Sequence, residues 1–259
     1  MSSSSVNSIL WVTGYPGCGK TTVGDYLAKY AGYAHVDVDD DFMFARFRDG
    51  KPDPDDKILT AYLKSWGEFF SGKTPSSDDF GPFLELVCDR ILSLQKEQMD
   101  GGAHGAKIVV TQGMHRVGRD FVRKRVPEIV FIGLAASVEK KMERARIKMD
   151  AFFPISEGRS HGEVFEERTG LQYTPQNFEK DWRDTNAARI RVMDKMDVET
   201  DEEHAGQGCN ISVDAVGDAG VLLEVRRICG IGPVGEDEDL NKVFEESWAK
   251  MDKQFNKVN

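Results

Sequence analysis

The chain has 259 residues, with 44 acidic and 34 basic side chains and a formal net charge of −10. This acidic excess disfavours a protein that binds nucleic acid through its phosphate backbone, because that affinity comes from clustered Lys and Arg. Hydrophobic residues make up 40% and charged residues 30% of the chain, which is typical of a globular protein with enough length to bury a core.

The sequence also excludes several special classes. Four widely spaced cysteines with no Cys-x-x-Cys pair indicate neither a zinc site nor a disulfide framework. No apolar run reaches the roughly 18 residues of a membrane span, and the Ser-rich start lacks the basic and apolar segments of a signal peptide. We therefore expect a cytoplasmic protein that binds neither membrane nor nucleic acid.

Short apolar runs alternate with segments of helical periodicity along most of the chain. Strands are expected at residues 8–13, 34–38, 107–111, 129–134 and 209–213. Helices are expected at residues 20–31, 56–70, 79–99, 116–125, 137–150 and 218–229. Strands that alternate with helices predict an α/β fold in which a parallel sheet is covered by helices on both faces.

Two segments fall outside this alternation. Residues 154–208 are polar and hold no convincing strand, so we expect a helical insertion followed by a loose connector. Residues 237–255 show helical spacing of apolar side chains and predict a helix packed against the domain. The predicted organisation is a disordered N-terminus (1–7), one domain (8–235) with lid and insertion at about 140–208, and a C-terminal helix (236–259).

One motif carries a specific chemistry. The segment Gly14-Tyr-Pro-Gly-Cys-Gly-Lys-Thr21 matches the phosphate-loop pattern G-x-x-x-x-G-K-[ST], and it lies between an expected strand and an expected helix. Lys20 is placed to reach the β and γ phosphates of a nucleotide, and Thr21 offers a hydroxyl to Mg²⁺. The residues expected to bind the nucleotide are Gly14, Gly17, Cys18, Gly19, Lys20, Thr21 and Thr22.

Acidic residues follow the second expected strand, at the edge of the sheet where ligands bind in open parallel sheets. Alternation along a strand would direct Asp37 and Asp39 to the same side. One of the two carboxylates can hold a Mg²⁺-bound water or accept a hydroxyl proton, and the other can bind substrate hydroxyls.

Further segments resemble gluconate kinases, in the same order along the chain. Residues 50–57 (Gly-Lys-Pro-Asp-Pro-Asp-Asp-Lys) are similar to that family's Gly-x-Pro-Leu-x-Asp-x-Asp-Arg segment, and residues 110–123 to its third strand and following helix. Residues 127–153 resemble its fourth strand and lid helix, and residues 210–214 its last strand. The resemblance covers about residues 8–153 and 209–230.

This resemblance implies the gluconate and shikimate kinase branch of the phosphate-loop kinases whose fold is that of nucleoside monophosphate kinases: a three-layer α/β/α fold with a five-stranded parallel sheet and a mobile lid. It implies transfer of the γ-phosphoryl group of ATP, with Mg²⁺, to a hydroxyl of a small acceptor. Asp37 is then assigned to the water shell of the metal that Thr21 binds through its hydroxyl, and Asp39 to substrate hydroxyls or to the role of a base. Catalytic roles are expected for Lys20, Asp39, Arg144 and Arg146.

An anionic acceptor is expected from two arginines. Arg119 and Arg123 are spaced i,i+4 on the helix after the third strand and could bind a carboxylate or phosphate, and Gly113 is placed with them at the substrate. The chain departs from the family where Ala151 replaces a histidine, where Tyr62 stands in place of a tryptophan, and where no histidine follows Asp39.

Two alternatives stay open. A nucleoside monophosphate kinase of the same fold would use the two arginines and the lid to hold an acceptor phosphate. A nucleotide-binding regulatory or assembly module would use the insertion and the C-terminal helix to bind another protein, with little transfer activity. We expect a monomer or a homodimer.

Overall fold

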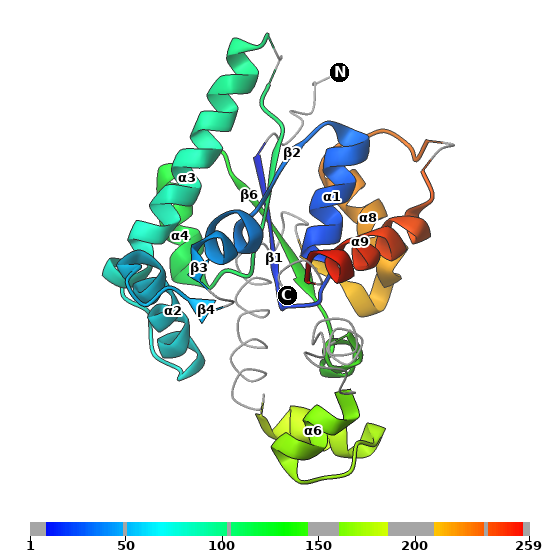
Figure 1. Cartoon of the computed structure of the whole chain (residues 1–259). Helices are drawn as coiled ribbons and strands as arrows, with labels where there is room; N and C mark the ends of the chain where they lie inside the picture. The colour runs from blue at the N-terminus through cyan, green and yellow to red at the C-terminus, as the bar shows by residue number, and fades with distance from the viewer. Residues whose placement is uncertain are drawn as a thin grey trace.

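The computed structural model describes residues 9–48, 51–102, 105–144, 161–185, 210–235 and 238–255. Five parallel strands form the central sheet, in the spatial order β2-β5-β1-β6-β7 (Figure 1). The strands are β1 (Ile9–Gly14), β2 (Ala34–Asp37), β5 (Ile108–Thr111), β6 (Val130–Ala135) and β7 (Asn210–Ser212). The predicted α/β fold with a five-stranded parallel sheet is thereby confirmed.

Helices cover both faces of this sheet (Figure 1). One side carries α1 (Lys20–Ala31), α8 (Val213–Ile228) and α9 (Leu240–Phe255). The other side carries α3 (Ser77–Asp100) and α4 (Arg116–Arg125), with α2 (Lys57–Phe70) packed on α3. The central strand shows why both faces need cover: Leu10 and Val12 belong to the core under α1, whereas Ile9 and Trp11 belong to the core under α3, and all four are fully buried.

Side-chain caps set the ends of two helices. Asp56 caps α2 by accepting a hydrogen bond from the amide of Leu59 (2.9 Å), so this helix begins one residue later than expected. Ser76 caps α3, which begins two residues before the predicted start. Helix α8 begins five residues early because it includes a kink at Gly217, where φ is +70°.

The segment after β2 contains elements that the apolar pattern did not predict. It continues as a π-helical turn, η1 (Asp39–Met43), and a 3₁₀ turn, η2 (Phe44–Arg46). A short antiparallel pair, β3 (Phe47–Arg48) and β4 (Lys51–Pro52), follows. These elements connect the acidic end of β2 to the start of α2.

Helix α9 packs against α1 and α8. A buried arginine, Arg226 of α8, donates hydrogen bonds to the hydroxyl of Tyr26 in α1, to Glu238, and to the carbonyls of Gly232 and Pro233. The contacts hold the chain that leads into α9 against the first helix. Within α9 itself, Ser247 accepts a hydrogen bond from Thr22 (2.9 Å), directly behind the phosphate loop.

The described part of the insertion is helical, with α6 (His161–Thr169) and a further helix over residues 175–185. Phe165, Phe178 and Trp182 form a separate small core that packs against Val138 and Met142, on the helix after β6. The predicted disordered N-terminus (1–7), the rest of the lid helix with Arg146, and residues 186–208 lie outside the described residues.

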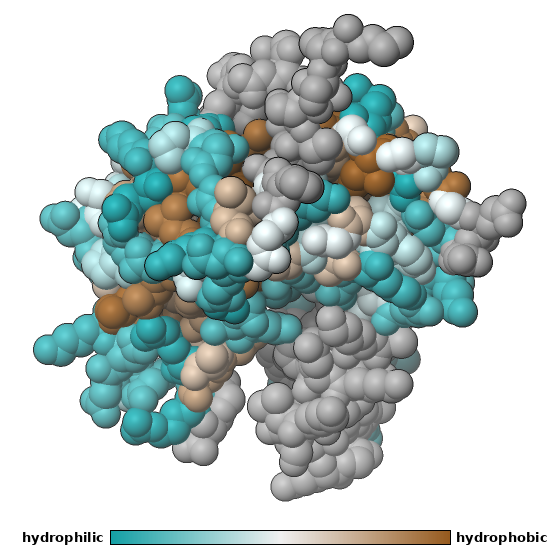
Figure 2. Space-filling model, turned by 90° about the horizontal axis from the view of Figure 1, so that it is seen from above, coloured by the Kyte–Doolittle hydropathy of each residue, from teal (hydrophilic) through white to brown (hydrophobic). Residues whose placement is uncertain are grey.

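The surface is mainly hydrophilic where the molecule is viewed from above, and its apolar areas are small and separated (Figure 2). Exposed large hydrophobic side chains are likewise dispersed over several elements, at Phe44, Met99, Leu171, Val216, Leu223 and Val234. In the part of the chain that is described, no helix has the length and apolar character needed to cross a bilayer.

Candidate active site

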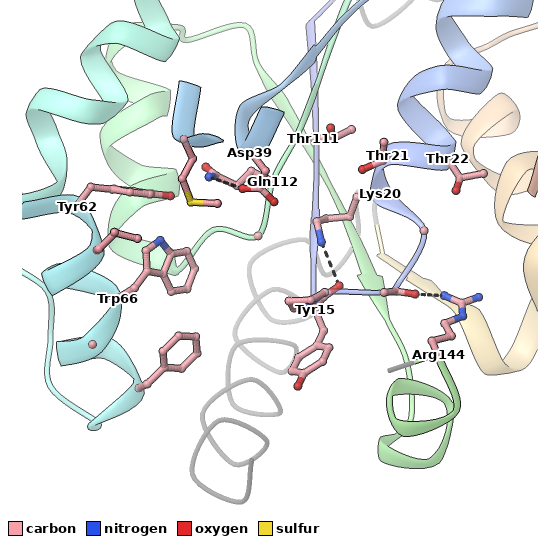
Figure 3. Close-up of a pocket in the computed structure, with 18 of the residues that line it drawn as sticks. Tyr15, Lys20, Thr21, Thr22, Asp39, Tyr62, Trp66, Thr111, Gln112 and Arg144 are labelled. Carbon is pink, nitrogen blue, oxygen red and sulfur yellow. Dashed lines mark hydrogen bonds between the residues drawn. The ribbon is translucent and has the colours of Figure 1, made fainter. Parts of the chain in front are cut away.

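A cavity of about 570 Å³ lies beside the phosphate loop, which we define as residues 14–21. The loop follows β1 and leads directly into α1, as the motif predicts (Figure 3). Gly17 and Gly19 both have φ of +92°, a backbone conformation that residues with a side chain rarely adopt. Gly19 is also the N-cap of α1 and brings no side chain there, so the first amides of the helix stay available to an anion.

Lys20 lines this cavity, and its ammonium group donates a hydrogen bond to the carbonyl of Tyr15 (3.1 Å) (Figure 3). That contact folds the lysine back over its own loop. The position suits a cation that meets the terminal phosphates of a nucleotide bound by the loop amides.

The other residues expected to bind the nucleotide include three whose side chains, or lack of one, serve mainly the packing of the domain. A Cβ on Gly14 would come within 2.4 Å of the Leu134 carbonyl, so this glycine permits close packing of β1 on β6. The side chain of Cys18 is buried in the core under α1, so only its main chain belongs to the loop surface. Thr22 lines the cavity, but its hydroxyl is engaged by Ser247.

The predicted metal-binding pair is in contact. The hydroxyl of Thr21 donates a hydrogen bond to Oδ2 of Asp37 (2.9 Å), and the other oxygen of Asp37 accepts one from the amide of Asp39 (3.1 Å). A hydroxyl and a carboxylate are the hard oxygen ligands that Mg²⁺ binds, usually together with waters and phosphate oxygens. The residues present therefore fit a magnesium ion at the phosphate loop.

Asp39 lines the cavity, but strand alternation, from which its position was predicted, is not the reason. Strand β2 ends at Asp37, and Val38 already has a helical backbone, so strand alternation does not relate the two aspartates. The π-helical turn instead places Asp39 on the cavity surface, where the amide of Gln112 donates a hydrogen bond to its Oδ1 (3.2 Å) (Figure 3). Asp39 and Lys20 thus line one cavity.

Arg144 lies on the opposite side of the phosphate loop from Asp39 (Figure 3). It is buried, lines the cavity, and donates hydrogen bonds to the carbonyl of Gly17 (2.5 Å) and to Asp218 of α8. One turn earlier, the ammonium of Lys141 lies 5.1 Å from the centre of the Tyr15 ring. The helix that leads toward the predicted lid is therefore anchored to the loop, while Arg146 lies outside the described residues.

The two arginines expected at an anionic acceptor lie elsewhere. Arg119 is fully buried and donates a hydrogen bond to the carbonyl of Met114 (2.7 Å). Arg123 lies over the ring of Phe131 (4.7 Å) and pairs with Asp120 (3.4 Å). Neither is among the residues that line the cavity, whereas Gly113 is; a Cβ at that position would come within 3.1 Å of the Gly14 carbonyl oxygen.

An aromatic wall, defined here as Tyr62, Trp66 and Phe70 of α2, faces the phosphate loop across the cavity. Figure 3 shows Tyr62 and Trp66 on the side opposite Lys20 and Arg144. Tyr62 was expected only as a replacement for a tryptophan, and the indole of Trp66 one helical turn later was not predicted to line the site. The i, i+4, i+8 spacing of the three rings was the available signal.

Two further features were not predicted. Phe244 of α9 lines the cavity beside Gly19, where a Cβ would come within 3.3 Å of its ring. Thr111, at the end of β5, also lines the cavity and bonds to Nε2 of His35 (2.9 Å), whose Nδ1 bonds to Asp25 (3.0 Å). Residues distant in sequence make both features, so local pattern does not reveal them.

The ionisation of two groups near the cavity is shifted by their surroundings. Burial raises the pKa of the Tyr62 phenol above its usual range, and the negative charge of Asp39 adds to the shift. Burial lowers the pKa of His115 to about 4, and the neighbouring Arg119 adds to that effect. Tyr62 is therefore a hydroxyl and His115 a neutral imidazole near neutral pH.

No protein-family model matches the chain, and no curated protein sequence matches it. Among solved structures, the chain is similar to a gluconokinase from Sinorhizobium meliloti 1021, with 15% identity, a TM-score of 0.36, and coverage of 98% of this chain and 96% of that one. It is also similar to an unliganded sugar kinase from Janibacter sp. HTCC2649, with 19% identity, a TM-score of 0.35, and coverage of 65% and 80%.

Proposed function

We propose that the protein is an ATP-dependent kinase that transfers the γ-phosphoryl group to a hydroxyl of a small molecule. The observation that carries this proposal is that Lys20 and Thr21 of the phosphate loop line the same cavity as the carboxylate of Asp39. A kinase of this type needs phosphate-binding groups and a group that handles the acceptor hydroxyl in one enclosed space.

Each group has a distinct task. Mg²⁺ bound by Thr21, with Asp37 in its water shell, would neutralise phosphate charge. Lys20 and Arg144 are the cations placed to meet charge that develops on the transferring group. Asp39 orients the acceptor hydroxyl and accepts its proton, and the amide of Gln112 holds this carboxylate in place.

Phosphoryl transfer exchanges one oxygen on the γ phosphorus for another. The acceptor oxygen forms a new bond to the γ phosphorus, and the bond from that phosphorus to the β–γ bridging oxygen breaks. ADP leaves with the electron pair of the broken bond, and the proton of the hydroxyl goes to Asp39. The acceptor becomes a phosphate ester.

Release of ADP, measured with a coupled assay at fixed MgATP, tests the proposal. Sugar acids, polyols, shikimate, nucleosides and nucleoside monophosphates serve as acceptors, and the Lys20→Ala variant supplies the background. Acceptor-dependent ADP release that Lys20→Ala abolishes supports transfer. Tight MgATP binding without turnover of any acceptor would count against it.

The monophosphate kinase alternative receives no support from the described residues. It relied on Arg119, Arg123 and the lid to hold an acceptor phosphate. Both arginines are engaged away from the cavity, and residues 145–160 of the predicted lid lie outside the described residues. Stimulation of ADP release by AMP, CMP or UMP in the same assay would restore it.

A further inference from the structure

The two ends of the cavity differ sharply in chemistry. Among the described residues that line it, the basic side chains are Lys20 and Arg144, and both belong to the phosphate-loop end. The far end is formed by the aromatic wall together with Leu63 and Met43. A ligand that extends from the transferring phosphoryl group toward α2 thus moves from cationic to aromatic surroundings.

The rings of the aromatic wall are fixed by other rings. Trp66 stacks on Phe70 (5.5 Å between centroids, 29° between planes) and meets Tyr62 edge-on (6.4 Å, 90°). Behind the wall, Tyr62 stacks on Phe83 (4.0 Å) and Trp66 contacts the ring of His115 (5.3 Å). A rigid aromatic surface of this kind favours a flat apolar face on the ligand, because little side-chain freedom is lost on binding.

The polar groups at this end accept hydrogen bonds. Asp39 is an acceptor when ionised, and Gln112, which also lines the cavity, donates a hydrogen bond to it through its NH₂ group, so the carbonyl oxygen is the acceptor that Gln112 has left. Both that oxygen and the Tyr62 hydroxyl are buried, and the described residues offer neither of them a hydrogen-bond partner. A buried polar group without a partner is unfavourable, so the carbonyl oxygen of Gln112 favours a ligand that supplies an N–H or O–H donor.

A carboxylate on the acceptor fits this end poorly. It would bring negative charge toward Asp39, and none of the described residues that line this end is a compensating cation. Arg119 and Arg123 do not compensate either, since neither lines the cavity. Charge and shape therefore argue for the same class of ligand.

We propose that the phosphoryl acceptor is an uncharged ring alcohol that packs one face on the aromatic wall and donates a hydrogen bond to the carbonyl oxygen of Gln112. This inference rests on the proposed kinase function and replaces the anionic acceptor expected from the sequence. The ring fixes the orientation of the molecule, and its hydroxyl is presented to Asp39.

The test compares uncharged ring alcohols with carboxylates in the full-length protein. Pyridoxine, uridine and methyl glucoside form the first set, and gluconate, shikimate and glucuronate the second. Calorimetry with MgADP present measures binding, and coupled ADP release with MgATP measures transfer. At least one ring alcohol is expected to bind and turn over, with kcat/KM about tenfold or more above every carboxylate.

The outcomes separate the two proposals. Binding of a ring alcohol without ADP release would refute phosphoryl transfer and leave the ring-binding site supported. Transfer to a carboxylate as the best acceptor would overturn the ring-alcohol proposal and support the kinase. Absence of binding by all three ring alcohols would also overturn the ring-alcohol proposal.

Variants of the wall add a second readout. Trp66→Leu is expected to raise the acceptor KM by about 10- to 100-fold with the ATP KM nearly unchanged, and Trp66→Phe is expected to restore most of that loss. Trp182→Leu is the matched control, because Trp182 lies in the separate core with Phe165 and does not line the cavity. Equal effects of Trp66→Leu and Trp182→Leu on the acceptor KM would contradict the proposal.

Discussion

The hydroxyl of Thr21 donates a hydrogen bond to the carboxylate of Asp37 across 2.9 Å, joining the start of α1 to the end of β2. The two residues are 16 positions apart, and parallel pairing of β2 and β1 with β5 brings them to the same edge of the sheet. The contact places a hydroxyl oxygen of the phosphate loop beside a carboxylate at the end of β2, and these are two oxygen ligands of the kind that Mg²⁺ binds.

Removal of the Thr21 hydroxyl is expected to weaken magnesium binding. Thr21→Val keeps the shape of the side chain but removes a metal ligand, so higher Mg²⁺ is needed for half-maximal ADP release and maximal turnover falls. A magnesium titration of the coupled assay measures this shift. Thr60→Val is the control because Thr60 is exposed on α2 outside the cavity; an unchanged magnesium dependence in Thr21→Val would refute the site.

Substitutions of Lys20 and of Asp39 are expected to impair the reaction in different ways. Lys20→Ala removes a preorganised cation from the transferring group and should lower kcat by several orders of magnitude. Asp39→Asn keeps the shape but removes the base, so transfer should stop while MgATP binding is preserved. Calorimetry with MgATP and the coupled assay together distinguish the two, and near-parental activity in both variants would show that the site is misplaced.

Helix α9 is expected to contribute to nucleotide binding. Phe244 lines the cavity beside Gly19 and is buried, so Phe244→Ala removes part of the cavity surface next to the loop. The ATP KM should rise by about tenfold, with a smaller change in the acceptor KM.

The loss of a buried ring also costs about 3–5 kcal/mol of stability, so Phe244→Leu serves as the milder variant. Kinetics are measured well below the melting temperature of each variant. A rise in the acceptor KM larger than that in the ATP KM would place Phe244 at the wrong end of the cavity.

The stability of the folded protein is expected to decrease as the pH is lowered and His115 becomes protonated. The pKa of His115 is lowered from 6.5 to about 4 in the folded protein, so the unfolded chain binds more protons between these values. The contribution of neutral His115 to the free energy of unfolding is therefore complete above about pH 6.5. It is lost as the pH falls toward 4, and the loss is on the order of 3 kcal/mol.

Burial of the ring and the neighbouring Arg119 both disfavour the charged form of His115. Nδ1 of the neutral ring also accepts a hydrogen bond from the amide of Gly118 (3.0 Å) and so caps α4. Urea unfolding between pH 4 and 7 measures the effect. His115→Asn keeps a capping acceptor without the titration, so its stability should depend less on pH in this window. Identical slopes for both proteins would contradict the assignment.

The sequence by itself determined the sheet, the helices that cover it, and the phosphate loop. Alternating apolar runs and helical periodicity are local signals, and the loop requires glycines, a lysine and a threonine at fixed spacing along one stretch of chain. The lysine and the threonine of that motif both line the cavity.

Only the tertiary structure decided what faces the loop. The phosphate loop, Asp39, the aromatic wall, Gln112, Arg144 and Phe244 come from separate elements, and their meeting depends on strand order and on how α2 and α9 pack. Helical position could not tell whether Arg119 points to a substrate, because a buried arginine bonded to a carbonyl has the same spacing as one that binds an anion. Contacts between distant segments are set by packing of the whole chain, so only the tertiary structure showed that the aromatic wall lies across the cavity from the phosphate loop.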